Sequence, residues 1–347
     1  RGVWLVAQSN VAVKNMAEKL ADVGFWDFRI LVSVEFHYDW HEHLYQKIDE
    51  RLIRSDMYPE TRLEAERMLG GARVMLCTLS TLSVNRVKPI THVVPLHTVL
   101  VDEASQIEVG DFVPMLYQYN KTLQKLVFIG DDKQLPPYGS EDIKDLRSIF
   151  EMRHLRKRAA FLDTQYRMPT FIGDFISKEV YQGKLKSQHP MQSPLVCRFI
   201  NVVHGQETSA GTSWKNEKEA ATIVNLVRGY MDKGLNFRVI TPYDAQRGTI
   251  EAALKHANLK WEDTVFNVDS FQGILAGNEC DNIIISLVRS GNKVGFLALQ
   301  RRVNVMLTRC KKTMTIVTKR SFVEGAGSSS LVGKLAKKCG PGAWFDA

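Results

Sequence analysis

The chain has 347 residues, 44% hydrophobic and 24% charged, so it is long enough for two globular domains and too apolar to be disordered. Its formal net charge of +8 suits a polyanionic partner but does not require one. The five cysteines form no Cys-x-x-Cys pair, which excludes the usual zinc spacings and favours reduced thiols in the cytoplasm or nucleus. No apolar run is long enough to cross a bilayer, and no secretory signal precedes the first strand-like segment.

The chain opens with a short apolar segment at residues 4–7, which predicts a strand. Apolar positions 13, 16, 17 and 20 then predict an amphipathic helix, and Ser9 or Asn10 is placed to cap it. The free amides of such a helix start also suit a phosphate of a nucleic-acid backbone. Capping and phosphate binding both remain open at this point.

Two further strands are predicted at 28–34 and 73–78, with a charged segment between them at about 35–70. Three histidines lie close together in that segment, at positions 37, 41 and 43. Because no further ligand cluster accompanies them, the pattern favours a solvated helix over a metal site. We therefore expect a helical insertion between core strands.

The next strand, at about 97–101, ends in two adjacent carboxylates, Asp102 and Glu103. Its apolar run is typical of a strand that is buried on both faces of a parallel sheet, whose carboxyl end is where α/β proteins bind ligands. In P-loop NTPases an acid at this point holds Mg²⁺, and a neighbouring acid can orient the attacking water. The alternative is a strand end followed by a helix cap.

A second strand, at 125–129, also ends in polar residues, with Asp131 and Gln134 followed by Pro136. Two parallel strands that both end in acidic turns predict a shared site at one edge of the sheet. A Gln beside a γ-phosphate can sense that phosphate.

The composition changes near residue 160, where we expect a domain boundary. The second half again alternates strands and helices, which predicts an α/β fold with parallel sheets flanked by helices. Arg167 precedes a proline-limited turn, where it can present its guanidinium across an interface, and Tyr166 offers a flat face to a base. A helix predicted at 301–309 places Arg302 and Arg309 on one stripe.

Seven ordered motifs resemble those of superfamily 1 helicases of the nonsense-mediated-decay and senataxin-like group. They occupy residues 8–13, 102–105, 130–137, 165–169, 241–243, 268–273 and 301–309. The resemblance implies two tandem RecA-like P-loop NTPase domains, at 1–160 and 161–325, followed by a C-terminal tail at 326–347. It also implies ATP bound between the domains and a single nucleic-acid strand lying across both.

The resemblance implies a role for each matching residue. Asp102 would hold Mg²⁺, Glu103 would be the general base on the attacking water, and Gln134 would read the γ-phosphate. Arg167 and Arg309 would reach the phosphates as arginine fingers, a role that suits an always-ionised guanidinium.

Other matching residues would contact the nucleotide base and sugar or the nucleic acid. Tyr166 would stack near the adenine, Glu279 would lie near the ribose, and Gln165 and Gly273 are grouped with them as cofactor-binding residues. The nucleic-acid track would comprise Ser9, Asn10, Thr78, Pro136, Thr241, Tyr243 and Ser270. Their contacts would be largely through the backbone, so binding would ignore sequence and weaken with salt.

Two features depart from the family pattern. The phosphate-binding loop G-x-x-x-x-G-K-[ST] is absent, and the Gly-Lys pairs at 183–184 and 333–334 are each followed by Leu. In the family this loop lies just upstream of the strand at Trp4, so we expect the chain to begin just after it and, as given, to bind ATP poorly. The family's Phe-Gln-Gly-x-Glu motif is also interrupted here, by residues 274–277.

Two hypotheses follow. The first is the core of an ATP-dependent RNA or DNA helicase, which couples ATP hydrolysis to 5′–3′ translocation on a single strand. The second is a catalytically impaired, helicase-like nucleic-acid-binding or scaffold protein. The paired domains and the two arginine motifs argue against a small P-loop kinase or GTPase.

Overall fold

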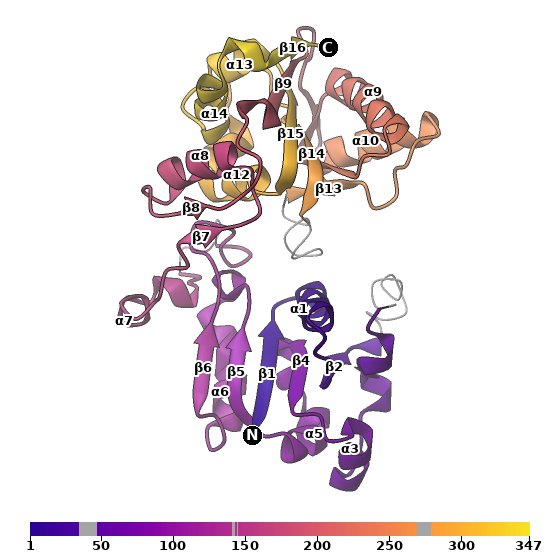
Figure 1. The fold of residues 1–347 in the computed structure, drawn as a ribbon, viewed down its shortest axis with the longest axis vertical. Coiled ribbons are helices and arrows are strands. Elements are labelled where there is room, and N and C mark those ends of the chain that lie inside the picture. Colours follow the sequence, from indigo (N-terminus) through magenta and orange to yellow (C-terminus); the bar gives the residue numbers. More distant parts are fainter. Residues whose placement is uncertain (35–46, 141–142, 144, 269–278) are drawn as a thin grey trace. The chain divides into compact units, whose positions relative to one another are not determined.

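The computed structural model describes residues 1–34, 47–140, 143, 145–268 and 279–347. These residues divide into two compact units, of which the first ends at Ala159 and the second begins at Ala160 (Figure 1). Each unit is built on a six-stranded sheet in which every pairing is parallel. The predicted α/β class, with parallel sheets flanked by helices, is confirmed.

The sheet of the first unit has the strand order β3-β2-β4-β1-β5-β6. Its strands are β1 (Gly2–Ala7), β2 (Phe28–Val32), β3 (Leu52–Arg54), β4 (Val74–Thr78), β5 (Leu96–Val101) and β6 (Lys125–Phe128). The central strand β1 places Leu5 beside Leu76 of β4 and Leu100 of β5. The neighbouring strands β4, β1, β5 and β6 therefore end along a common edge.

Helices cover both faces of this sheet. The helices are α1 (Asn10–Asp22), α3 (Arg62–Leu69), α4 (Leu79–Leu82), α5 (Lys88–Val93), α6 (Val113–Tyr119) and α7 (Arg153–Arg156). On one face α1 buries Val13 and Ala17 in a core with Ile30. On the other face Trp4 and Met75 lie in a larger core. Because both faces are covered, the strands are apolar on both sides, as their sequences predict.

Residues 47–70 differ from the predicted helical insertion. After residues 35–46, which lie outside the described residues together with the three histidines, the chain forms strand β3 before it enters α3. Strand β3 pairs with β2, with Ile53 beside Leu31. This strand of three residues is too short to show a period of two, and it is stabilised by its neighbour and not by local propensity.

The sheet of the second unit has the strand order β13-β12-β14-β15-β9-β16. Its strands are β9 (Cys197–Asn201), β12 (Phe237–Thr241), β13 (Val265–Asn267), β14 (Cys280–Ser286), β15 (Cys310–Thr318) and β16 (Trp344–Asp346). Short pairs form outside it, β7 (Thr164–Gln165) with β8 (Lys186–Ser187), and β10 (Thr208–Ala210) with β11 (Ser213–Lys215).

Two groups of helices flank this second sheet (Figure 1). On one side lie α9 (Glu217–Asp232) and α10 (Asp244–His256), and on the other lie α8 (Thr170–Val180), α12 (Gln300–Leu307), α13 (Arg320–Glu324) and α14 (Leu331–Cys339). Ile223 and Val227 of α9 are buried in a core with Ile284 of β14.

The predicted tail at 326–347 is not separate but belongs to the second unit. Helix α14 buries Leu331 and Leu335, and β16 pairs with β9 through Trp344 and Phe199, whose rings lie 4.7 Å apart. The Gly- and Ser-rich residues are thus a short connection before a packed helix. The apolar face of that helix explains why the segment folds onto the sheet.

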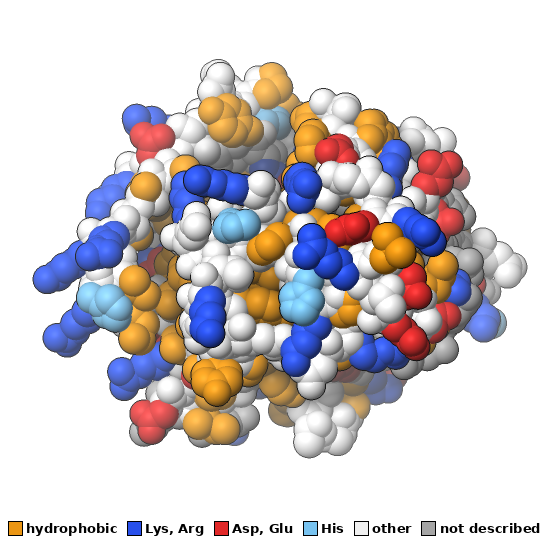
Figure 2. Space-filling model, turned by 90° about the horizontal axis from the view of Figure 1, so that it is seen from below, with side chains coloured by type: hydrophobic (Ala, Val, Ile, Leu, Met, Phe, Trp, Pro, Cys, Tyr) orange, Lys and Arg blue, Asp and Glu red, His pale blue; other side chains and the backbone are white. Residues whose placement is uncertain are grey.

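Blue Lys and Arg occur across the whole face seen from below in Figure 2, among orange apolar groups, whereas most of the red carboxylates lie toward its right-hand side. The excess positive charge therefore does not form a single patch on this face. Among the described residues, no helix combines the length and apolarity that a membrane crossing requires.

Candidate functional site

The first unit brings its predicted site residues to one edge of the sheet. Residues Ala7 of β1 and Thr78 of β4 are paired, as are Val6 of β1 and Val101 of β5, and Val101 and Phe128 of β6. The residues that follow these strand ends are therefore neighbours along the edge. They are Ser9 and Asn10 after β1, Asp102 and Glu103 after β5, and Asp131, Gln134 and Pro136 after β6.

Asp102 is a half-buried carboxylate at the centre of this edge. Its backbone N–H donates to Val6 O at 2.8 Å, and its Oδ1 accepts from Glu103 N–H at 2.9 Å. Burial raises the pKa of the Asp102 carboxyl above its usual value, and the hydrogen bond from Glu103 partly offsets that rise. No ion pair of Asp102 occurs within the described part of the chain. A carboxylate without a counter-charge fits Mg²⁺, which prefers oxygen ligands.

Glu103 has a backbone conformation that is rare for its residue type. Its φ is 51°, in the left-handed region, and its Oε2 accepts from Gln106 Nε2 at 3.2 Å. Non-glycine residues in this region store strain and cluster at functional sites. The strained turn at the end of β5 is therefore a second, independent indication of a site at this edge.

Gly130 allows the turns after β5 and β6 to pack closely. A Cβ at this position would lie 2.9 Å from Ser105 N and 3.2 Å from Ala104 N, which is too close for any side chain. The contact is fixed by Ala104 N–H, which donates to Ile129 O at 2.9 Å. The acids of β5 and the polar turn of β6 are thus held together by their backbones.

Gln134 is held by the turn in which it lies. Its Nε2 donates to Asp131 Oδ2 at 2.9 Å, and Asp131 Oδ1 accepts from Lys133 N–H at 2.9 Å. Asp131 therefore fixes both the backbone and the amide of this turn. Pro136, which follows, is half-buried.

Ser9 and Thr78 each cap a helix. Ser9 Oγ accepts from Ala12 N–H at 3.2 Å, and Asn10 is the first residue of α1. Thr78 is 5% exposed, and its Oγ1 lies 2.9 and 2.8 Å from the hydroxyls of Ser80 and Thr81. The structure shows capping, so a phosphate at these helix starts would have to use backbone amides.

In the second unit, Arg167, Glu279 and Lys311 form a charged cluster. Arg167 Nε pairs with Glu279 Oε2, and Lys311 Nζ lies 3.1 Å from Glu279 Oε1. Arg167 Nη1 also donates to Thr308 O at 3.4 Å. Burial disfavours the ionised form of Glu279, but the two cations outweigh it and hold the pKa of this carboxyl below its usual value. The cluster thus holds two cations around one carboxylate and carries a net positive charge.

Arg309 lies beside this cluster but outside the helix that the sequence predicts. Helix α12 ends at Leu307, and β15 begins at Cys310, so Arg302 and Arg309 do not share a helical stripe. Arg309 is 3% exposed, and its Nε donates to Val305 O at 3.1 Å. The prediction was wrong here because the pairing of β15 with β14 takes over the last positions of the periodic pattern.

Gln165 shapes the turn that carries Tyr166 and Arg167. Its Oε1 accepts from Arg167 N–H at 3.0 Å and from Met168 N–H at 2.8 Å, and its Nε2 donates to Met168 O at 3.0 Å. Tyr166 is 66% exposed. The amide thus braces a turn that leaves the tyrosine ring free for a flat partner.

Thr241 and Tyr243 lie at the carboxyl end of β12, whereas Glu279 precedes the neighbouring strand β14, so the two groups occupy opposite edges of the second sheet. Thr241 is fully buried, and Tyr243 Oη accepts from Phe296 N–H at 3.2 Å. The predicted residues Ser270 and Gly273, and the insertion 274–277, lie outside the described residues.

The sequence reasoning missed a buried carboxyl, Glu219, behind the end of β14. Glu219 is fully buried and accepts from Ser286 Oγ–H at 2.6 Å and from Val288 N–H at 2.9 Å. Burial raises the pKa of Glu219 to about 8, against the effect of these hydrogen bonds. Val288 has a φ of 69°, which is strained for a β-branched residue. The spacing of Glu219 from the helix cap Asn216 is the signal that could have revealed it.

Two parallel α/β units, with acids after one strand and a Gln-bearing turn after the next, are typical of the fold of tandem RecA-like P-loop NTPase domains. Two AAA domain families match the chain, one at residues 146–321 and the other at residues 38–139. The chain belongs to the superfamily 1 helicases, in the nonsense-mediated-decay and senataxin-like group.

Three relatives illustrate the likeness. The chain is 30% identical to the Regulator of nonsense transcripts 1 homolog of Arabidopsis thaliana, over 91% of this chain and 29% of that protein. It is 25% identical to the DNA polymerase alpha-associated DNA helicase A of Saccharomyces cerevisiae, over 94% of this chain and 53% of that protein. It is 28% identical to the ATP-dependent helicase upf1 of Schizosaccharomyces pombe, over 89% of this chain and 38% of that protein. The chain thus spans about half or less of the length of these relatives.

Proposed function

We propose that this chain is the ATP-hydrolysing core of a helicase that moves 5′ to 3′ along single-stranded RNA or DNA. The observation that carries the proposal is the pair Asp102 and Glu103, which the backbone of Gly130 holds beside the turn of Gln134. The names of its relatives, an ATP-dependent helicase and a DNA helicase among them, support the same activity. The cytoplasm or nucleus is the proposed location.

The first unit would supply the acidic groups. Asp102 would hold Mg²⁺, which neutralises phosphate charge when bound. Glu103 would take the proton of the attacking water at its carboxylate oxygen, as a general base does. Gln134, released from Asp131, would orient that water against the γ-phosphate.

The second unit would supply the cations. Arg167 and Arg309 would stabilise the charge that develops on the transferred phosphoryl group. In the structure Glu279 neutralises Arg167, and Val305 O accepts from Arg309. We propose that nucleotide phosphate competes with these partners, while Tyr166 stacks on the adenine and Glu279 turns to the ribose. Gln165 would act as a positioning residue through its turn.

The nucleic-acid strand would run along backbone groups near Ser9, Asn10, Thr78 and Pro136 in the first unit. In the second unit it would pass Tyr243, Thr241 and Ser270. Backbone contacts of this kind carry no sequence information and weaken as salt displaces them.

The test is ATP turnover by the purified full-length protein, with and without single-stranded RNA or DNA. We expect a strand to stimulate hydrolysis, and Glu103→Gln to lower kcat by about 10²–10⁴-fold, the usual contribution of a general base. Absence of hydrolysis with both nucleic acids would overturn the proposal.

A second candidate rests on the sequence, because residues 274–277 interrupt the Phe-Gln-Gly-x-Glu motif of the family. In that case the chain would act as a helicase-like nucleic-acid-binding or scaffold protein. It would bind a single strand in a salt-sensitive manner, with an affinity that ATP does not change. A shift in strand affinity on adding ATP would argue against this second candidate.

A further inference from the structure

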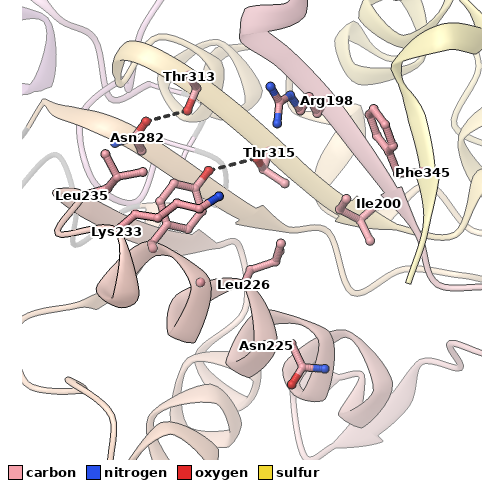
Figure 3. A pocket seen from close by; sticks show the side chains of 12 residues that line it. Arg198, Ile200, Asn225, Leu226, Lys233, Leu235, Asn282, Thr313, Thr315 and Phe345 are labelled. Atoms are coloured by element: carbon pink, nitrogen blue, oxygen red, sulfur yellow. Dashed lines mark hydrogen bonds between the residues drawn. The ribbon is translucent and has the colours of Figure 1, made fainter.

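The second unit contains a pocket of about 510 Å³ that none of the roles above explains (Figure 3). It lies between the second half of α9 and the strands β9, β14 and β15, and Phe345 of β16 forms part of its wall. The residues discussed as nucleotide or nucleic-acid contacts do not line it. Its volume falls within the range of sites that bind small ligands and peptide side chains.

The pocket exists because α9 covers only part of its face of the sheet. Ile223 and Val227 of this helix pack against Ile284. Farther along the helix, Gly229 has no side chain, and a Cβ there would meet nothing within 4 Å. Strands β9 and β16 extend the sheet beyond the helix, so Arg198 and Phe345 remain exposed.

The floor of the pocket is polar, but its groups are already paired. Thr313 Oγ1 donates to Asn282 Oδ1 at 2.7 Å, and Tyr230 Oη lies 3.3 Å from Thr315 Oγ1, as the dashed lines of Figure 3 show. Asn282 Nδ2 also donates to Asn236 O at 2.7 Å. These bonds fix the floor and leave few free donors on it.

The walls are apolar and open to solvent. In Figure 3, Leu235 lies at one end, Leu226 at the middle, and Ile200 with Phe345 at the other end. Leu235 is 42% exposed and Phe345 is 48% exposed. Exposed apolar side chains that line a concave site mark a surface that binds a partner.

Two cations, Arg198 and Lys233, line the pocket. Among the described residues of the lining they carry the only formal charges, and none of these residues is a carboxylate. Within the described part of the chain, neither side chain has an ion pair or a hydrogen bond. Other cations of the unit do have acidic partners, for example Lys215 with Glu217 and Lys334 with Glu179. The pocket therefore presents unbalanced positive charge beside apolar walls.

We propose that this pocket binds a short segment of a partner protein in which Asp or Glu residues flank apolar side chains. The carboxylates would pair with Arg198 and Lys233, and the apolar side chains would fill the space beside Leu226 and Gly229. Complementary charge sets the register of such contacts, and buried apolar side chains supply most of the affinity. A nucleic-acid strand fits less well, because it requires a row of cations and of aromatic faces for stacking. The described lining of this pocket has two cations and two aromatic side chains, Tyr230 and Phe345, beside three aliphatic ones.

The test uses a phage library of random 12-residue peptides, selected on the full-length protein. Two variants remove the site in different ways: Arg198→Glu with Lys233→Glu reverses its charge, and Gly229→Leu fills its space. Gly229→Leu also improves helix propensity, so loss of folding is not expected from it. Arg228→Glu is the control for charge reversal outside the pocket, since it reverses one charge on the exposed side of α9, half of the change that the double variant makes.

We expect selected peptides to combine Asp or Glu with Leu, Ile or Phe. Their affinity should fall about tenfold or more in both site variants and stay within about twofold in Arg228→Glu, as electrostatic and packing contacts predict. ATP turnover should be unchanged in all variants, so this test is independent of the proposed function. Selection without acidic enrichment would overturn the proposal. Equal binding to Gly229→Leu, or displacement of the peptides by a single-stranded oligonucleotide, would also overturn it.

Discussion

The edge of the first sheet that carries Asp102, Glu103 and Asp131, called the acidic edge below, differs from the charged cluster of the second unit in how its charges are balanced. Asp102 is half-buried, its pKa is raised by burial, and it has a backbone N–H but no cation as a partner within the described residues. Glu279 is also partly buried, but Arg167 and Lys311 hold its pKa low. Among the described residues, Asp102 thus has no cation beside it, whereas Glu279 is paired with two.

Under the proposed function, this difference would decide how each site responds to nucleotide. The first would take a cation from solution, which a divalent metal ion can provide. The second would exchange its internal ion pair for a contact between its arginine and a phosphate. Exchange of one charge partner for another leaves no buried charge unpaired, so the net change in free energy on nucleotide binding can be small.

The largest expected effect is a loss of ATP turnover when Arg309 of the second unit is changed. Arg309→Lys should lower kcat for ATP about 10³-fold, because a lysine cannot reproduce the planar guanidinium that stabilises the transition state. Steady-state turnover and nucleotide binding on the same preparation measure this effect. Arg309 is also buried, so a purely structural role would instead lower the free energy of unfolding and leave kcat per folded molecule unchanged.

Glu219 should make the free energy of unfolding depend on pH more strongly than the acidic edge or the charged cluster does. Its pKa is about 8 in the folded chain against an ordinary value of 4.5, so between these pH values the folded state holds an extra proton. Stability from this group is complete below about pH 4.5 and falls by up to roughly 1.4 kcal/mol per pH unit as pH rises towards 8. Denaturant unfolding of the wild type and of Glu219→Gln at several pH values checks this. Parallel curves for the two proteins would contradict it.

Gly130→Ala should disturb the acidic edge through the backbone alone. The new Cβ would approach Ser105 N to 2.9 Å, so the turns after β5 and β6 must separate. We expect a loss of about 1–3 kcal/mol in the free energy of unfolding, the usual cost of overpacking. Gly229→Ala is the matched control and should be neutral or stabilising, because its Cβ meets nothing. Equal stability of both variants would argue against close packing of the two turns.

Glu279→Gln should have the smallest effect on stability, about 1 kcal/mol, since its partners are partly exposed and screened by solvent. The pKa of Glu279 is lowered on folding, so its contribution is present above about pH 4.5 and disappears as pH falls through the lower, folded value. Chemical denaturation at neutral and acidic pH compares the variant with the wild type. A difference that persists at low pH would show that the ion pair is not its source.

The sequence predicts the fold where long apolar runs specify buried strands. The strand before Asp102 and the neighbouring strand before Asp131 are examples, and their shared edge follows from parallel pairing. Prediction from the sequence fails for the short strands β3 and β16. These strands form because the neighbouring strands β2 and β9 offer them backbone hydrogen-bond partners. Tertiary pairing of this kind leaves no local pattern.

The details of the site are less predictable than its position. The positive φ of Glu103 and the packing of Gly130 depend on two turns that are far apart in sequence. The pair of Arg167 and Glu279 joins residues that are 112 positions apart, and the burial of Glu219 depends on β14. Motif spacing identifies residue types, whereas charge balance and strain arise only from the folded chain.

Mn²⁺ binding tests the assignment of Asp102 most directly, with electron paramagnetic resonance of the full-length protein in the presence of ATP as the measurement. Asp102→Asn should weaken Mn²⁺ binding about tenfold or more, because it removes a charged oxygen ligand from the metal. Asp111→Asn, an exposed acid near the same sheet, is the control and should change the affinity less than about twofold. Equal Mn²⁺ affinity in the wild type and Asp102→Asn would contradict the assignment of Asp102 as the metal ligand.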